Sequence, residues 1–110
     1  MTELILTTEN DRIIDIQMNR PPVNALNLEL VEALHQEIDS HTNNGAKGLM
    51  LSGREGIYSA GLDVKKLLEM DADEISIFFR LFWGLMAKIS KSPIPIAAAI
   101  TGHSPAGGAV

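Results

Sequence analysis

Residues 48–64 read GLMLSGREGIYSAGLDV, and this stretch decides how the chain is interpreted. Its first five residues, Gly48–Ser52, are an apolar run that predicts a short strand buried on both faces. A loop follows over residues 53–61 and contains several small side chains. Asp63 is then a suitable N-cap for a short helix that ends near Met70. The stretch therefore predicts a strand, a loop and a helix start in immediate succession.

Residues 96–110 repeat this architecture and read IAAAITGHSPAGGAV. Residues 96–100 predict a second buried strand, whose three alanines allow neighbouring elements to approach closely. Residues 101–104 are expected to form a loop. Pro105 fits the first turn of a helix, because its missing N–H would be unpaired there in any case.

Both stretches carry small residues next to the expected helix start. These residues are Ser59, Ala60 and Gly61 in the first stretch and Ala106, Gly107 and Gly108 in the second. Small side chains allow a ligand to reach the unpaired N–H groups of a helix start, which attract developing negative charge. Two such groups aimed at one point would form an oxyanion hole. The same pattern also fits tight packing of a strand against a helix, so spacing alone leaves both interpretations open.

The remaining segments predict a hairpin and two amphipathic helices. Residues 4–8 and Ile13–Met18 are strand-like, with a turn at residues 9–11 between them. Asn27 is the expected N-cap of a helix that runs to about His41. The face of this helix that we expect to be buried consists of Leu30, Val31, Leu34 and Ile38.

A longer helix is expected after Asp71, which is a suitable N-cap. Its large apolar residues recur at helical spacing, which favours the core or a subunit interface over a cofactor site. They are Ile75, Phe78, Phe79, Phe82, Trp83, Met86 and Ile89.

Composition excludes several classes of protein. The 110 residues form one domain at most, and 45% apolar with 21% charged residues is typical of a soluble globular protein. A net charge of −5 without a basic stripe argues against sequence-independent nucleic-acid binding. Without cysteine there is no disulfide, thiolate metal site or cysteine nucleophile. Without a signal-peptide pattern or a long apolar span, a cytoplasmic protein that does not act at a membrane is expected.

Three motifs together resemble the enoyl-CoA hydratase/isomerase, or crotonase, family. They are residues 19–27 (NRPPVNALN), residues 58–63 (YSAGLD) and residues 99–108 (AITGHSPAGG), in the order and approximate spacing of that family. The resemblance covers essentially the whole chain and implies an α/β fold of repeated ββα turns wound into a spiral. It also implies a homo-trimer or a dimer of trimers. Residues 1–110 are expected to be the N-terminal part of such a domain, truncated within a helix start.

The resemblance also implies a site. The two amides of the family's oxyanion hole carry over onto Ala60 and Gly107, and the acyl-CoA thioester would be the substrate. The residues expected to bind it are Ser59, Ala60, Gly61, Leu62, Asp63, Val64 and Gly107. CoA would be part of the substrate, so neither a separate cofactor nor a metal ion is expected.

Val110 indicates the reaction class. The hydratases resembled here have a water-activating Glu three residues after the glycine that aligns with Gly107, where this chain has Val110. Loss of one acid/base group argues against hydration and favours isomerisation of a 3-ene to a 2-ene, which needs one carboxylate. That carboxylate is expected beyond residue 110, and Glu55 is the weaker candidate within the chain. Two alternatives stay open: another crotonase-type reaction, namely hydration, thioester hydrolysis, dehalogenation or decarboxylation, and a non-catalytic acyl-CoA-binding or assembly module.

Several polar residues near the expected site have plain structural interpretations. Asp63 is favoured as a helix N-cap over a catalytic group. Lys65 and Lys66 either approach the CoA phosphates or are solvated charges on a helix. His103 is able to titrate near neutral pH but is more simply a structural loop residue. The remaining histidines, His35 and His41, are expected to be exposed.

Overall fold

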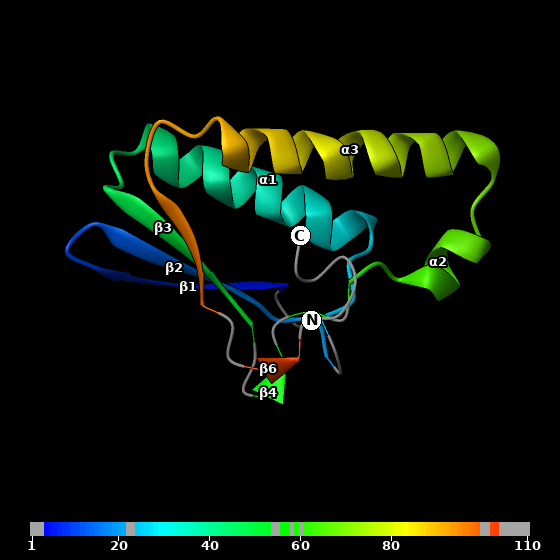
Figure 1. Cartoon of the computed structure of the whole chain (residues 1–110), viewed down its shortest axis with the longest axis horizontal. Helices are drawn as coiled ribbons and strands as arrows, with labels where there is room; N and C mark the ends of the chain where they lie inside the picture. Colours follow the sequence, from blue (N-terminus) through cyan, green and yellow to red (C-terminus); the bar gives the residue numbers. More distant parts are fainter. Residues whose placement is uncertain are drawn as a thin grey trace.

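The protein forms a mixed sheet with two long helices stacked over one of its faces (Figure 1). The computed structural model describes residues 4–21, 24–53, 56–57, 59, 61–99 and 102–103. The strands of the sheet are β1 (Ile5–Asn10), β2 (Ile13–Met18), β3 (Gly48–Ser52) and β5 (Ile96–Ala99), in the order β1-β2-β3-β5. The helices are α1 (Leu28–Asn43), α2 (Val64–Leu68) and α3 (Ala72–Ser90). The expected α/β class is confirmed.

Strand direction changes once across the sheet. β1 and β2 are antiparallel, whereas β2 pairs parallel with β3 and β3 pairs parallel with β5. Parallel neighbours need crossover connections, and here α1 crosses from β2 to β3 while α2 and α3 connect β3 to β5. The carboxyl ends of β2, β3 and β5 therefore point toward the same edge of the sheet.

The hairpin turn is tighter than expected. We expected residues 9–11 to form the turn, but Glu9 and Asn10 belong to β1 and pair with Ile14 and Ile13. The turn is Asp11-Arg12, with φ values of 53° and 68°. Two successive positive φ angles define a type I′ turn, whose twist matches that of the flanking strands. The strand therefore extends two residues further than its propensity indicates.

Side chains of the preceding residues start both long helices. Asn27 Oδ1 accepts a hydrogen bond from the Leu30 amide at 2.9 Å, which confirms the predicted N-cap of α1. Asp71 forms a reciprocal capping box with Glu74 at the start of α3. Each cap satisfies an amide that the first helical turn leaves without a partner.

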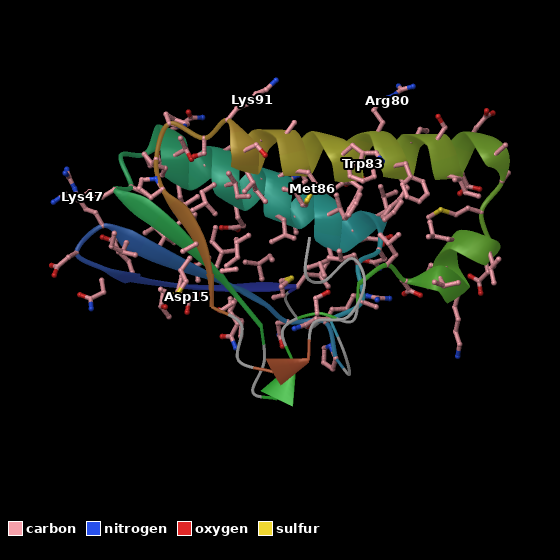
Figure 2. The ribbon with its side chains drawn as sticks, in the orientation of Figure 1. Asp15, Lys47, Arg80, Trp83, Met86 and Lys91 are labelled. Carbon is pink, nitrogen blue, oxygen red and sulfur yellow. The ribbon has the colours of Figure 1, made fainter. Side chains whose placement is uncertain are left out.

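The core lies between the sheet, α1 and α3. Leu30, Val31, Leu34 and Ile38 are buried, as the sequence predicts. From α3, Phe78 and Phe82 enter the same core with ring centroids 6.2 Å apart. Figure 2 shows Met86 directed toward α1, whereas Arg80 and Lys91 point away from it. Trp83 departs from the aromatic pattern, because it is 59% exposed.

Two strands are less buried than expected. Met50, at the centre of β3, is 36% exposed, and Ala97 and Ala98 of β5 are exposed. Within the described residues the helices lie over one face of the sheet, and β5 is its last strand. The expectation of burial on both faces is therefore wrong for β3, and that of a buried strand is wrong for β5.

The two histidines of α1 are partly buried, whereas the sequence predicted exposed positions. His35 is partly buried, with Nε2 2.8 Å from the carbonyl oxygen of Leu81 on α3. His41 Nε2 lies 3.0 Å from a carboxylate oxygen of Glu37, one turn earlier in α1. The prediction of exposed histidines is wrong, because packing of α3 on α1 and a helical i,i+4 contact give both rings partners.

Truncation of Leu30 tests the position of the core. Leu30 is fully buried, so Leu30→Ala is expected to lower the free energy of unfolding by about 2–5 kcal/mol in urea denaturation. Glu32→Ala, at an exposed position of the same helix, is the matched control and should change it by less than about 0.5 kcal/mol. Equal effects of the two substitutions would contradict the assigned face of α1.

Candidate functional site

Two loops that leave the same edge of the sheet come together below it (Figure 1). They follow β3 and β5, and each contains a two-residue strand: β4 (Gly56–Ile57) and β6 (Gly102–His103). Gly56 pairs with Gly102 and Ile57 with His103, in parallel. We expected plain loops at both places, so this pairing is a correction. It joins the two stretches that the sequence singled out.

Ser59 connects the first loop to the segment before α1 and to its own next turn through one hydroxyl group. Its side chain is buried, and its hydroxyl donates to the carbonyl oxygen of Asn24 at 2.8 Å. The hydroxyl oxygen of Ser59 also accepts a hydrogen bond from the amide of Gly61 at 3.1 Å. Gly61 has φ 88°, a conformation that glycine adopts without steric cost. The hydroxyl therefore fixes a turn that a bulkier residue at position 61 would strain.

A short backbone ladder holds the end of the same loop. Leu26 and Leu62 form an isolated parallel bridge. The Leu26 amide donates to Gly61 at 2.6 Å, and the Asp63 amide donates to Leu26 at 2.9 Å. The loop is thus fastened to the segment just before α1.

That segment has its own tight turn. The amide of Arg20 donates to Asn24 Oδ1 at 2.7 Å, and the amide of Asn24 donates to the Arg20 carbonyl at 2.8 Å. Asn24 is fully buried and has φ 51°, which asparagine tolerates better than most residues. Arg20, Asn24 and Leu26, which belong to the motif recognised from sequence, are therefore bonded to one another or to the loop.

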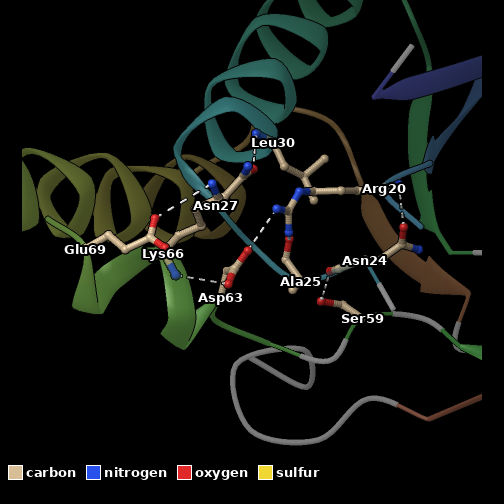
Figure 3. A network of polar contacts seen from close by, with 9 residues as sticks. All are labelled: Arg20, Asn24, Ala25, Asn27, Leu30, Ser59, Asp63, Lys66 and Glu69. Carbon is tan, nitrogen blue, oxygen red and sulfur yellow. Dashed lines mark hydrogen bonds and ion pairs between the residues drawn. The ribbon is translucent and has the colours of Figure 1, made fainter. Parts of the chain in front are cut away.

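Asp63 uses its two carboxylate oxygens for two different contacts (Figure 3). Oδ1 accepts a hydrogen bond from the Lys66 amide at 3.2 Å, which confirms the predicted N-cap of α2. Oδ2 lies 2.8 Å from Nη2 of Arg20. Nη1 of Arg20 donates to the carbonyl oxygen of Ala25 at 2.8 Å. Sequence alone assigns Arg20 no role of its own, because nothing in the local pattern identifies Asp63 as its partner.

The other predicted binding residues lie on or beside α2. Leu62 is half-buried at the bridge, and Val64 is 61% exposed in the first turn of α2. Lys65 and Lys66 are exposed, and Lys66 Nζ lies 3.9 Å from Glu69. This arrangement fits solvated helix charges and leaves them available to a ligand.

Several expected residues lie outside the described part of the chain. They are Glu55, Ala60, Pro105, Ala106, Gly107, Gly108 and Val110. His103 is described only as a backbone position in β6. The assignments made to these residues stay predictions.

No group of three or more His, Asp or Glu side chains in the described residues is arranged to hold a metal ion. None of the helices in the same ranges has the length and hydrophobicity needed to cross a bilayer.

Comparison with known proteins gives consistent relatives. Enoyl-CoA hydratase domain-containing protein 2, mitochondrial, of Mus musculus is 36% identical over 108 residues, which are 94% of this chain and 36% of that protein. Among solved structures, a probable enoyl-CoA hydratase of Mycobacterium tuberculosis matches with a TM-score of 0.89 at 29% identity, over 97% of this chain and 45% of the other.

A human mitochondrial delta3-delta2-enoyl-CoA isomerase also matches, with a TM-score of 0.89 at 27% identity, over 96% of this chain and 43% of the other. This chain therefore spans about a third of the mouse relative and less than half of either solved structure. These structural matches confirm the expected crotonase-like fold. The family model for enoyl-CoA hydratase/isomerase matches residues 8–110, so the chain belongs to that family.

Proposed function

We propose that the protein binds an acyl-CoA thioester and shifts its double bond from the 3- to the 2-position through an enolate. The amides of Ala60 and Gly107 donate to the thioester oxygen. The observation that carries this proposal is the parallel pairing of β4 with β6. It brings together the loops that lead to residues 60 and 107, as a two-amide oxyanion hole requires.

The chemistry balances within the substrate and one base. The base takes a proton from C2, and the electron pair of that C–H bond forms a double bond between C1 and C2. The π electron pair of the carbonyl moves onto the thioester oxygen, which gives an enolate conjugated with the 3-ene. Return of the proton to C4 restores the carbonyl and leaves the double bond between C2 and C3. Amides fixed beside the oxygen stabilise the charge where it develops, and loss of one such donor typically costs about 3–4 kcal/mol in barrier height.

Val110 favours isomerisation over hydration. Hydration of a 2-ene uses two acid/base groups, whereas transfer of a proton from C2 to C4 uses one. Val110 occupies the position of one of the hydratases' two carboxylates, and the remaining base is expected beyond residue 110. The relatives carry both names, hydratase and isomerase, so the reaction must be decided by its product.

The substrate would lie along the loop that ends at α2. Ser59, Ala60, Gly61, Leu62, Asp63, Val64 and Gly107 remain the proposed binding residues. Most contribute backbone or a small surface, since Ser59 and Asp63 use their polar atoms on neighbouring residues. CoA enters as part of the substrate and no separate cofactor is required.

Assembly and location are part of the same proposal. A homo-trimer or a dimer of trimers is expected for the complete protein. A cytoplasmic location also stays a prediction. The mouse relative, by contrast, is named as a mitochondrial protein.

The reaction class is tested by the products formed from two thioesters. The protein made from its complete coding sequence should convert a 3-enoyl-CoA into the 2-enoyl-CoA, with incorporation of deuterium at C2 or C4 in D2O. It should hydrate a 2-enoyl-CoA at least about 10-fold more slowly, because it lacks one acid/base group. Mass spectrometry of the products distinguishes isomerisation from hydration, because hydration adds the mass of one water whereas isomerisation changes the mass only by the deuterium incorporated.

Fast hydration without isomerisation would contradict the assignment and return the protein to the hydratases. If neither thioester is turned over, the isomerase assignment is wrong and the remaining crotonase-type reactions, thioester hydrolysis, dehalogenation and decarboxylation, are the ones to assay. Acyl-CoA binding without any turnover would support a binding or assembly module instead.

Proline at position 60 tests the oxyanion amide. Ala60→Pro removes the N–H donor and is expected to lower kcat by about 100- to 1,000-fold. Ala60→Gly, which keeps the donor, is the matched control and should retain kcat within about 5-fold. Circular dichroism checks that both variants are folded. A folded proline variant with wild-type kcat would exclude this amide from the reaction.

A further inference from the structure

The C-terminal end of the loop that carries Ala60 is bonded to one short segment of the chain, through Ser59, Gly61 and the following Asp63. Ser59 bonds to Asn24, Gly61 accepts from the amide of Leu26, and Asp63 donates its amide to the carbonyl of Leu26. Ala60 lies between Ser59 and Gly61 in the sequence. A contact that holds Asn24 and Leu26 in place therefore also restrains both neighbours of Ala60.

Arg20 contacts this segment through both its backbone and its side chain. Its amide and its carbonyl both bond to Asn24, at 2.7 and 2.8 Å. Its guanidinium reaches across the turn, with Nη1 donating to Ala25 and Nη2 facing Asp63. Figure 3 shows the guanidinium directed toward Asp63 and Ala25. The backbone of Arg20 is thus bonded to Asn24, and its guanidinium is bonded to Ala25 and Asp63.

We propose that Arg20 and Asp63 are positioning residues that hold the Ala60 loop in the geometry its oxyanion amide needs. The proposal rests on the function proposed above and assigns neither side chain a contact with the substrate. Asp63 is suited to the task because its two oxygens connect two elements, the N-terminus of α2 and the segment before α1. The guanidinium is suited because it presents several donors in one plane, which a lysine cannot.

A general stabilising role is the competing explanation, and a second ion pair in the chain separates the two. Lys88 Nζ and Asp39 Oδ2 are 2.6 Å apart and join α3 to α1. Asp39 lies twelve residues along α1 from its N-cap Asn27, which is about 18 Å along the helix at 1.5 Å per residue. Substitution of either pair removes one ion pair, but only the Arg20–Asp63 pair contacts the loop.

The pattern of kinetic effects tests positioning. Asp63→Asn keeps an oxygen for the N-cap, since asparagine is as good a cap as aspartate, but loses the charge that faces Arg20. Arg20→Met keeps the backbone contacts and loses the guanidinium. Each variant of the complete protein is expected to lower kcat by about 10- to 100-fold, because a misplaced donor loses its effect. KM should change by less than about 3-fold, since the oxyanion charge develops mainly in the transition state.

Two further variants test whether the residues act as a unit. The double variant Arg20→Met/Asp63→Asn should be no slower than the worse single variant, as expected when both changes break one contact. Arg20→Lys, which keeps the charge but not both donors, should give an intermediate kcat. The controls Lys88→Met and Asp39→Asn should keep kcat within about 2-fold.

Amide hydrogen exchange gives a readout that does not depend on activity. The amides of Gly61 and Asp63 are bonded to Ser59 and Leu26, so they should exchange at least about 10-fold faster in Arg20→Met and Asp63→Asn. Amides within α3 should keep their wild-type rates. In the two control variants the loop amides should remain protected.

The outcomes separate this proposal from the proposed function. Faster loop exchange together with the kcat-selective loss supports positioning. Unchanged loop exchange, or faster exchange with wild-type kcat, overturns it while leaving the enolate chemistry in place. A wild-type protein inactive on enoyl thioesters overturns the proposed function, and the exchange rates then still decide whether the ion pair holds the loop.

Discussion

The parallel alignment of β2, β3 and β5 is the constraint on which the site depends. Strands that run in the same direction release their loops at the same edge, so two segments distant in sequence emerge as neighbours. The pairing of β4 with β6 continues that alignment beyond the sheet. The crossovers that parallel pairing requires are the helices that form the core, which leaves the strand ends free to carry chemistry.

Side chains and backbone share the work around the first loop. Arg20, Asn24, Ser59 and Asp63 direct their described polar contacts at other groups of the protein, and together they hold a short turn. The reacting donors in the proposed mechanism are backbone amides, whose use requires small neighbours and a fixed turn. This division explains why the stretch around Ala60 contains few side chains that resemble catalytic groups.

Sequence predicted well what is decided locally. The caps Asn27, Asp63 and Asp71 were recognised because a cap acts within one turn, and the buried face of α1 follows from helical spacing. Prediction from sequence failed for contacts between segments that are far apart in the chain. These are the Arg20–Asp63 contact, the β4–β6 pairing and the contact of His35 with α3. The exposure of β5 was also missed, because composition does not reveal which strand lies at an edge. Ala60 and Gly107 were assigned by resemblance and stay predictions.

The most direct test is a crystal structure of the complete protein with a 3-ketoacyl-CoA, whose enolate carries negative charge on the thioester oxygen. The distances from that oxygen to the amide nitrogens of Ala60 and Gly107 are the quantities to measure. Values of about 2.7–3.1 Å to both nitrogens are predicted, as in an oxyanion hole built from the loops after β3 and β5. A thioester oxygen beyond about 3.5 Å from either nitrogen would contradict this assignment of the site.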